Sequence, residues 1–284
     1  DPFEMTPAAL RLCRKANAVA ELHGETAREM WAEVEDAAPI VAITNGVHMG
    51  TWQDSVLAGY SRRREWEAMW DRHQEHKREL LNTIAKRVGS KLREDALLIG
   101  FARRAATYKR ATLLLQDRAW LEARFEKDGL QFVFAGKAHP RDRYGQAFIK
   151  ELVLAGKKYP AHVVFIPNYD MHLGALLTRG ADVWLNNPIR PKEASGTSGM
   201  KAAANGVLNL SIMDGWWAEG CEHGVNGWGV GAPPAGVDAD LHDREALQGL
   251  IESDVLPAYR DRHQWLEMMR ASISSASENF SADR

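Results

Sequence analysis

Lys201 stands in a run of small residues, where its amine could react rather than simply carry a surface charge. The surrounding sequence, from 193 to 206, is EASGTSGMKAAANG. We expect Lys201 in the first turn of a helix with alanines behind it, and desolvation in such company lowers the pKa of a lysine. A lowered pKa favours a covalent Schiff base with a carbonyl compound. A phosphate-binding lysine in a nucleotide site is the alternative, and the spacing alone does not separate the two.

Two segments could bind an anion. Ahead of the lysine, small residues let the backbone approach a ligand, Thr197 or Ser198 could cap the helix, and free N–H groups at a helix start attract phosphate. The second segment, ARRAATYKR at 102–110, places four cations within eight residues. We expect it at a strand-to-helix junction, where the helix N-terminus adds positive charge. A solvated basic face is the alternative interpretation of this second segment.

Five short apolar runs, each bounded by Gly, Pro, Asn or Asp, must position these segments. They lie at 97–101, 132–135, 163–166, 183–185 and 207–212. Stretches of helical length separate several of them, which predicts a doubly wound, Rossmann-like parallel sheet of the α/β class. Ligands bind at the carboxyl ends of the strands in such sheets. The basic segment follows the first run and the lysine segment follows the fourth, so we expect both at this edge.

The remaining segments are mostly helical in pattern. Helical spacing runs through 6–37 and about 52–88, and the region from about 243 onwards has the pattern of two further helices. Residues 40–43 have the pattern of a short buried strand. We expect 1–38 to comprise a vector-derived stretch and the helical tail of an N-terminal domain. We expect 39–284 to be a C-terminal, cofactor-binding domain with a helical insertion at about 52–90.

Composition excludes several classes of function. The chain has 284 residues and a formal net charge of −2, so no strong field favours nucleic acid or an anionic membrane. No apolar run approaches the ~20 residues that a membrane span needs. Two distant cysteines without CxxC spacing argue against a disulfide framework and fit a cytoplasmic protein. His73 and His76 lack a third ligand, so we predict no metal site and a solvated helix face there.

Together these segments resemble the α-glucan phosphorylases, the family of the glycogen, starch and maltodextrin phosphorylases. EASGTSGMK at 193–201 is similar to that family's pyridoxal-phosphate lysine signature, and TYKR at 107–110 is similar to its phosphate-binding segment. Four further segments match in order and rough spacing: Asn17-Ala18-Val19, TNGV at 44–47 followed by Trp52, FAGKAHP at 134–140, and Asn168-Tyr169. TNGVH, GWWAEG and RAATYKRA are similar to the shorter bacterial and archaeal branch.

The resemblance implies a glycosyltransferase-B architecture of two Rossmann-like domains, of which this chain would hold the C-terminal one. The parent enzyme would transfer the terminal α-1,4-linked glucosyl unit of a glucan to inorganic phosphate, giving glucose 1-phosphate. Its cofactor would be pyridoxal 5′-phosphate. Its partners would be the glucan, phosphate or glucose 1-phosphate, and the missing N-terminal domain, and this chain alone would be inactive.

The resemblance also assigns roles to single residues. The catalytic residues would be Arg104, Lys109 and Glu193, with Arg104 binding the substrate phosphate. The cofactor would be linked to Lys201 and contacted by Gly196, Thr197, Ser198, Lys109, Tyr169 and Trp52. The glucosyl unit would contact Asn45, Val19, Glu193, Ser195 and Gly196.

Two other functions stay open. A sugar-nucleotide glycosyltransferase such as a glycogen synthase would also place a glutamate and a Gly-rich helix start after the fourth strand, but it needs no lysine eight residues beyond Glu193. A non-catalytic glucan-binding domain could keep the fold without the cofactor.

Overall fold

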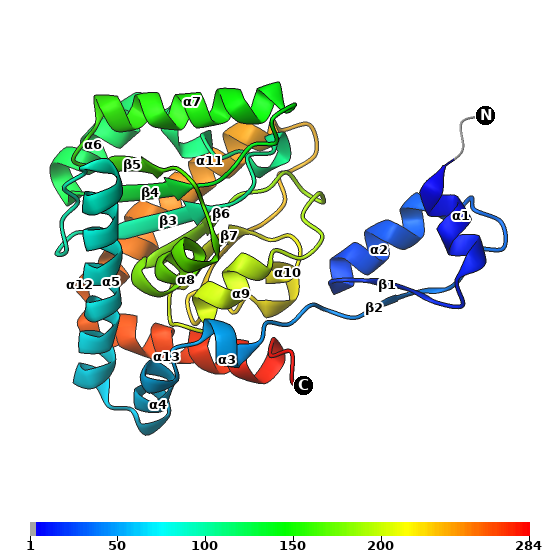
Figure 1. The fold of residues 1–284 in the computed structure, drawn as a ribbon, viewed down its shortest axis with the longest axis horizontal. Coiled ribbons are helices and arrows are strands. Elements are labelled where there is room, and N and C mark those ends of the chain that lie inside the picture. The colour runs from blue at the N-terminus through cyan, green and yellow to red at the C-terminus, as the bar shows by residue number, and fades with distance from the viewer. Residues whose placement is uncertain (1–3) are drawn as a thin grey trace.

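Six parallel strands form the central sheet of the computed structural model, which describes residues 4–284 (Figure 1). They are β3 (Leu98–Ala102), β4 (Gln131–Ala135), β5 (Val163–Ile166), β6 (Val183–Asn186), β7 (Leu208–Ile212) and β8 (Gly227–Val230). Their order, β5-β4-β3-β6-β7-β8, confirms the predicted doubly wound α/β fold. The five predicted runs are β3 to β7. The strand β8 is not among the predicted runs, because glycines at 227 and 229 interrupt its apolar pattern.

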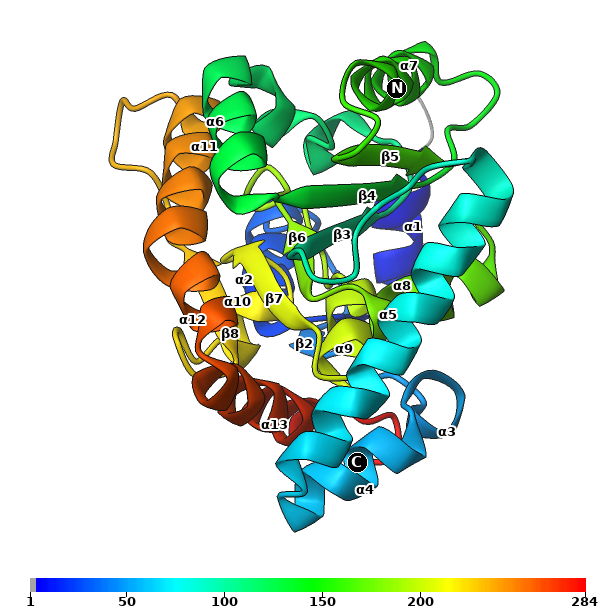
Figure 2. The same cartoon turned by 90° about the vertical axis from the view of Figure 1, so that its left-hand side faces the viewer.

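Helices cover both faces of this sheet (Figure 2). One face packs against α6 (Arg118–Asp128), α7 (Arg143–Lys158) and α11 (Ala239–Leu250), and the other packs against α5 (Trp66–Val88), α8 (Met171–Gly180) and α9 (Thr197–Ala203). Side chains along β3 alternate between the two faces. Ile99 and Phe101 pack in the core between the sheet and the first group of helices, and Leu98 and Ala102 pack in the core on the opposite face.

The predicted helical insertion consists of three helices. They are α3 (Met49–Trp52), α4 (Ser55–Arg63) and the long α5. On α5 the expected solvated histidine face is wrong, because His73 and His76 are buried and contact the carboxylates of Asp182 and Asp54 at 2.9 and 2.5 Å. Among the described residues, no group of three or more His, Cys, Asp or Glu could hold a metal ion.

The N-terminal segment extends away from the sheet (Figure 1). It contains α1 (Met5–Leu12), β1 (Ala16–Ala18), α2 (Glu21–Met30) and β2 (Ile40–Ala42). The prediction of helix throughout 6–37 is wrong, since β1 separates two helices and pairs in parallel with β2. The strand at β2 is not buried as expected, because this two-stranded sheet leaves Val41 40% exposed. The pairing of β1 with β2 joins residues on both sides of the predicted domain boundary between 38 and 39. The division into two domains stays a prediction.

The C-terminal region returns to the start of the main body. After α11 come a π-helical turn (Ile251–Val255), α12 (Leu256–Arg260) and α13 (Arg262–Asn279). Beyond α13, the N–H of Val47 donates to Phe280 O at 2.8 Å and the N–H of Ala282 donates to Val47 O at 3.0 Å. Across residues 4–284, none of the helices combines the length and the apolar character needed to cross a membrane.

Candidate functional site

The loops after β3 and β6 meet at the carboxyl edge of the sheet, because these strands are neighbours although the chain forms them first and fourth in the sheet. A change of strand order of this kind opens a crevice where α/β sheets bind ligands. A pocket of about 340 Å³ lies at this point. Its walls are Val19, Asn45, Ala102, Arg103, Arg104, Lys109 and the continuous run 193–198. The basic segment and the small-residue segment therefore face one site, as the topology predicts.

Glu193 holds two cations together inside this pocket. Its carboxylate accepts hydrogen bonds from Arg103 Nη2 at 2.6 Å and from Lys109 Nζ at 2.9 Å, and all three side chains are buried. Arg103 also donates to the side-chain oxygen of Asn186, the last residue of β6. Arg104 is exposed at the rim. With three cations and one carboxylate along its wall, the pocket is suited to an anion.

Burial shifts the titration of two groups here. Desolvation, together with the nearby charges of Arg103 and Arg104, lowers the pKa of Lys109 to about 8, against the opposing effect of Glu193. Desolvation raises the pKa of Asp214 to about 6, although N–H groups of Glu193 and Gly215 donate to its carboxylate. Lys109 therefore still carries its charge at neutral pH, and an entering anion would stabilise that charge.

Arg103 and Asp214 are the site residues that the sequence assignments miss. Arg103 directly follows β3, and Asp214 follows β7 by two positions and anchors the backbone of Glu193 at 3.0 Å. Both satisfy the rule that functional side chains come just after parallel strands. That rule was sufficient to find them, whereas the family pattern directed attention to Arg104.

Both helix starts differ from what the sequence predicts. Thr107–Lys109 forms a short 3₁₀ turn that ends at Arg110 with φ 48°, so no α-helix N-terminus adds charge to the basic segment. The α9 helix begins at Thr197 after Gly196, whose φ of 92° suits glycine, and no side chain caps it. Lys201 consequently lies in the last turn of a short helix rather than in the first turn.

Three of the predicted site residues do not line the pocket: Lys201, Trp52 and Tyr169. All the other predicted site residues line it. Lys201 Nζ lies 3.6 Å from the centroid of the Trp52 ring, and burial lowers the pKa of this lysine. The buried side chain of Asn205 donates to the carbonyls of both Trp52 and Lys201, at 2.9 and 2.8 Å. Tyr169 is partly buried against the core cluster that contains Ala202.

Ser195 has a buried hydroxyl without a partner. Its Oγ makes no hydrogen bond within residues 4–284, although the residue lies in the pocket wall and is only 4% exposed. Buried polar atoms are nearly always hydrogen-bonded. An unpaired hydroxyl at a pocket wall is therefore suited to contact a polar ligand.

Comparison with known proteins identifies the family. The model of the carbohydrate phosphorylase family matches residues 55–223, which is more than half of the chain. The chain belongs to the carbohydrate phosphorylase family.

Several relatives are named as phosphorylases. The chain is 37% identical to the maltodextrin phosphorylase of Thermococcus litoralis, with 100% of this chain and 40% of the relative aligned. It is 35% identical to the glycogen phosphorylase of Aquifex aeolicus, with 99% of this chain and 48% of the relative aligned. It is 37% identical to the glycogen phosphorylase of Mycobacterium tuberculosis, with 99% of this chain and 39% of the relative aligned. The chain thus spans less than half the length of these relatives, and the predicted bacterial and archaeal likeness is confirmed.

Proposed function

We propose that this chain is the C-terminal, cofactor-binding half of an α-glucan phosphorylase. The whole protein would transfer the terminal α-1,4-linked glucosyl unit of a glucan to inorganic phosphate and release glucose 1-phosphate. The observation that carries the proposal is the buried arrangement of Arg103, Lys109 and Glu193 at the point where the strand order changes. We assign the activity to the cytoplasm, in keeping with two cysteines that form no disulfide.

The pocket suits inorganic phosphate. In a partly buried site, charge-assisted hydrogen bonds from arginine and lysine to a phosphate oxygen are stronger than in water. Arg103 donates one of its N–H groups to Glu193, so an incoming phosphate would use the remaining N–H groups of that arginine. Arg104, exposed at the rim, is free to close over it. We infer that Arg104 binds the substrate phosphate.

The residues also fit pyridoxal phosphate. Lys201 Nζ has no carboxylate partner among residues 4–284, and its lowered pKa favours the neutral amine that attacks a carbonyl. The α9 helix begins after Gly196 without a side-chain cap, and the first N–H groups of a helix have no partner within it. We expect Lys201 to hold the cofactor, Trp52 and Tyr169 to line it, and Lys109 with the backbone of 196–198 to bind its phosphate. When bound, pyridoxal phosphate supplies a second phosphate group, which exchanges a proton with inorganic phosphate.

The chain's own residues then position the sugar and neutralise charge. Two phosphates close together repel strongly, and the cations of the basic segment offset that repulsion. We expect Glu193, Ser195 and Gly196 to contact the glucosyl unit, with the unpaired hydroxyl of Ser195 as one hydrogen-bonding group. Val19 and Asn45 would contact it from the N-terminal segment, where the N–H of Asn45 donates to Val19 O at 3.0 Å.

Ligand binding to the chain itself tests this proposal. The purified chain would be titrated by calorimetry with inorganic phosphate, pyridoxal phosphate and UDP-glucose. We expect it to bind phosphate and to retain pyridoxal phosphate after dialysis. Tight UDP-glucose binding without cofactor retention would instead favour a sugar-nucleotide glycosyltransferase, and a chain that binds only a maltooligosaccharide would favour a non-catalytic glucan-binding domain.

A further inference from the structure

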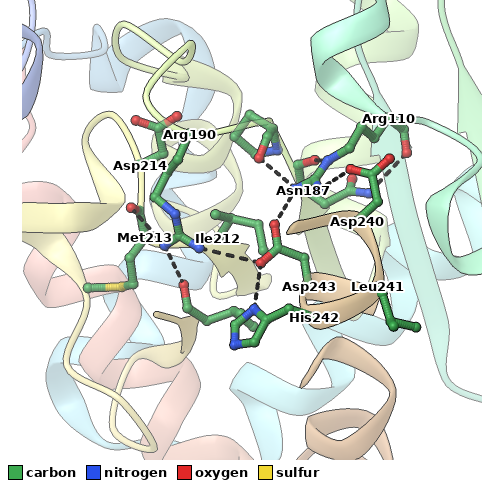
Figure 3. A network of polar contacts seen from close by, with 12 residues as sticks. Arg110, Asn187, Arg190, Ile212, Met213, Asp214, Asp240, Leu241, His242 and Asp243 are labelled. Atoms are coloured by element: carbon green, nitrogen blue, oxygen red, sulfur yellow. Dashed lines mark hydrogen bonds and ion pairs between the residues drawn. The ribbon is translucent and has the colours of Figure 1, made fainter. Parts of the chain in front are cut away.

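A buried carboxylate that does not line the pocket bridges two arginines (Figure 3). Asp243, in the first half of α11, is 2% exposed. Its Oδ2 accepts a hydrogen bond from Arg110 Nη2 at 2.6 Å, and its Oδ1 lies 3.5 Å from Arg190 Nη2. The ring Nδ1 of His242 lies 3.0 Å from the same Oδ1. None of these residues lines the pocket, and the proposed function assigns them no role.

Arg110 connects the loop after β3 to the loop after β6. Its Nε donates to Asn187 O at 2.9 Å, and its Nη2 donates to Pro188 O at 2.7 Å. In return, the side-chain amide of Asn187 donates to Arg110 O at 3.0 Å. Arg110 directly follows Lys109, and Asn187 directly follows the asparagine that contacts Arg103. These contacts therefore fix the backbone on both sides of the charged pocket.

Arg190 makes the corresponding connection to the last two strands. It donates through Nη1 to Val230 O at 3.0 Å and to Met213 O at 3.4 Å, and through Nη2 to Gly231 O at 2.5 Å. The next residue after Met213 is Asp214, which accepts the hydrogen bond of the Glu193 backbone. Through its two arginines, Asp243 is thus connected to the carboxyl ends of β3, β6, β7 and β8.

We propose that Asp243 is a positioning residue for the phosphate pocket, because it holds the loop that carries Lys109 at a fixed separation from the loop that carries Glu193. Neither arginine contacts Glu193, so the effect is transmitted through backbone position. Removing a buried charge leaves its partners uncompensated, and the loops that they join would separate. The inference rests on the proposed function, since it takes the pocket to bind phosphate.

The same helix offers a matched control. Asp240 accepts from Arg110 Nη1 at 2.8 Å, but its side chain is 53% exposed and it does not contact Arg190. Exposed ion pairs contribute little because water screens them. Asp243→Asn and Asp240→Asn each remove one negative charge from α11 and one carboxylate partner from Arg110. The two aspartates differ in their burial and in contact with Arg190, which only Asp243 makes.

Calorimetric titration of the 284-residue chain with inorganic phosphate tests the proposal. We expect Asp243→Asn to weaken phosphate binding about tenfold and Asp240→Asn to change it less than about twofold. Equal affinities for the two variants would overturn the inference and leave the proposed function intact. A wild-type chain that binds no phosphate would contradict the proposed function itself.

A second readout does not require phosphate. The pH midpoint of Lys109 acetylation, measured by mass spectrometry, reports how closely Arg103, Arg104 and Glu193 surround this lysine. Loosened loops admit water, so in Asp243→Asn we expect the midpoint to rise from the wild-type value toward that of an ordinary lysine. An unchanged midpoint would overturn the inference, because Lys109 would then be as closely surrounded as in the wild-type chain.

A milder variant serves if Asp243→Asn does not fold. Arg190→Lys keeps the charge but loses the forked geometry that reaches two strand ends. We expect it to weaken phosphate binding about threefold. Wild-type affinity in that variant would overturn the inference.

Discussion

Lys109 is buried and shares the Glu193 carboxylate with Arg103, and this environment determines how it titrates. Its pKa of about 8 means that the ammonium form, which binds anions, is lost as the pH rises through 8. We therefore expect sulfate, whose charge is constant across this range, to bind the chain progressively less tightly between pH 7 and pH 9. Calorimetric titrations over that range measure the effect. Lys109→Arg, which stays charged, should abolish the pH dependence, and a persistent dependence would assign it to another group.

Arg104 and Lys109 differ in exposure, and we expect them to act on different phosphates. Loss of a charge-assisted contact costs roughly 1.5–3 kcal/mol, or about one to two powers of ten in affinity. In the full-length protein, Arg104→Ala should raise the KM for phosphate while cofactor content stays near full. Lys109→Ala should lower cofactor content, and added pyridoxal phosphate should partly restore turnover. Two variants with the same cofactor content and the same phosphate dependence would refute this division.

At the scale of elements, a buried ion pair fastens α5 to the sheet. Lys77 Nζ donates to Asp182 Oδ2 at 2.6 Å, both side chains are fully buried, and the same oxygen accepts from the N–H of Leu98 at 2.8 Å. Asp182→Asn would leave Lys77 without its counter-ion. We expect a loss of about 3–5 kcal/mol in the free energy of unfolding, measured with urea.

An exposed ion pair formed by the next residue of α5, Arg78, provides the comparison for that measurement. Arg78 and Glu94 form an ion pair with side chains 51% and 41% exposed. Glu94→Gln should cost less than about 1 kcal/mol, because solvent screens the pair. Similar losses in the free energy of unfolding for the two variants would mean that burial does not strengthen the Lys77–Asp182 ion pair.

The elements that the sequence predicts are those whose pattern is local. The strands β3 to β7 are apolar runs between turn residues, and their alternation with helices indicates the sheet directly. The missed features depend on distant partners. His73 is followed by charged residues typical of a solvated face, yet a carboxylate more than one hundred positions away holds it in the core. Likewise, Arg103 and Arg104 are adjacent arginines after the same strand, and the contacts of Arg103 with Glu193 and Asn186 distinguish them.

At the scale of the whole molecule, the C-terminal end of the chain holds a segment that lines the pocket. Thr44 Oγ1 donates to Glu219 Oε2 at 2.8 Å, and the Arg284 guanidinium donates to the carbonyl of Thr44. A Cβ added to Gly46 would lie only 2.7 Å from Ser281 O, so glycine is required for this close approach. The segment that supplies Asn45 is therefore held from the C-terminal end of the chain.

The pocket of about 340 Å³ is open to solvent in this chain, and Arg104 is exposed at its rim. Phosphorolysis needs water excluded and the glucan positioned, which a single domain does not provide. We expect this chain to release glucose 1-phosphate from maltooligosaccharide and phosphate at least about a thousandfold more slowly than a full-length protein. A coupled assay with both proteins at equal concentration measures the ratio. Comparable rates would contradict this expectation.

Covalent mapping of the cofactor tests the central claim most directly. The chain would be incubated with pyridoxal phosphate, reduced with borohydride and digested, and the modified peptide identified by mass spectrometry. We predict a single major adduct on Lys201, absent from Lys201→Ala and present in Lys192→Ala, which removes an exposed lysine nearby. An adduct on another lysine, or none on Lys201 at saturating cofactor, would contradict the account.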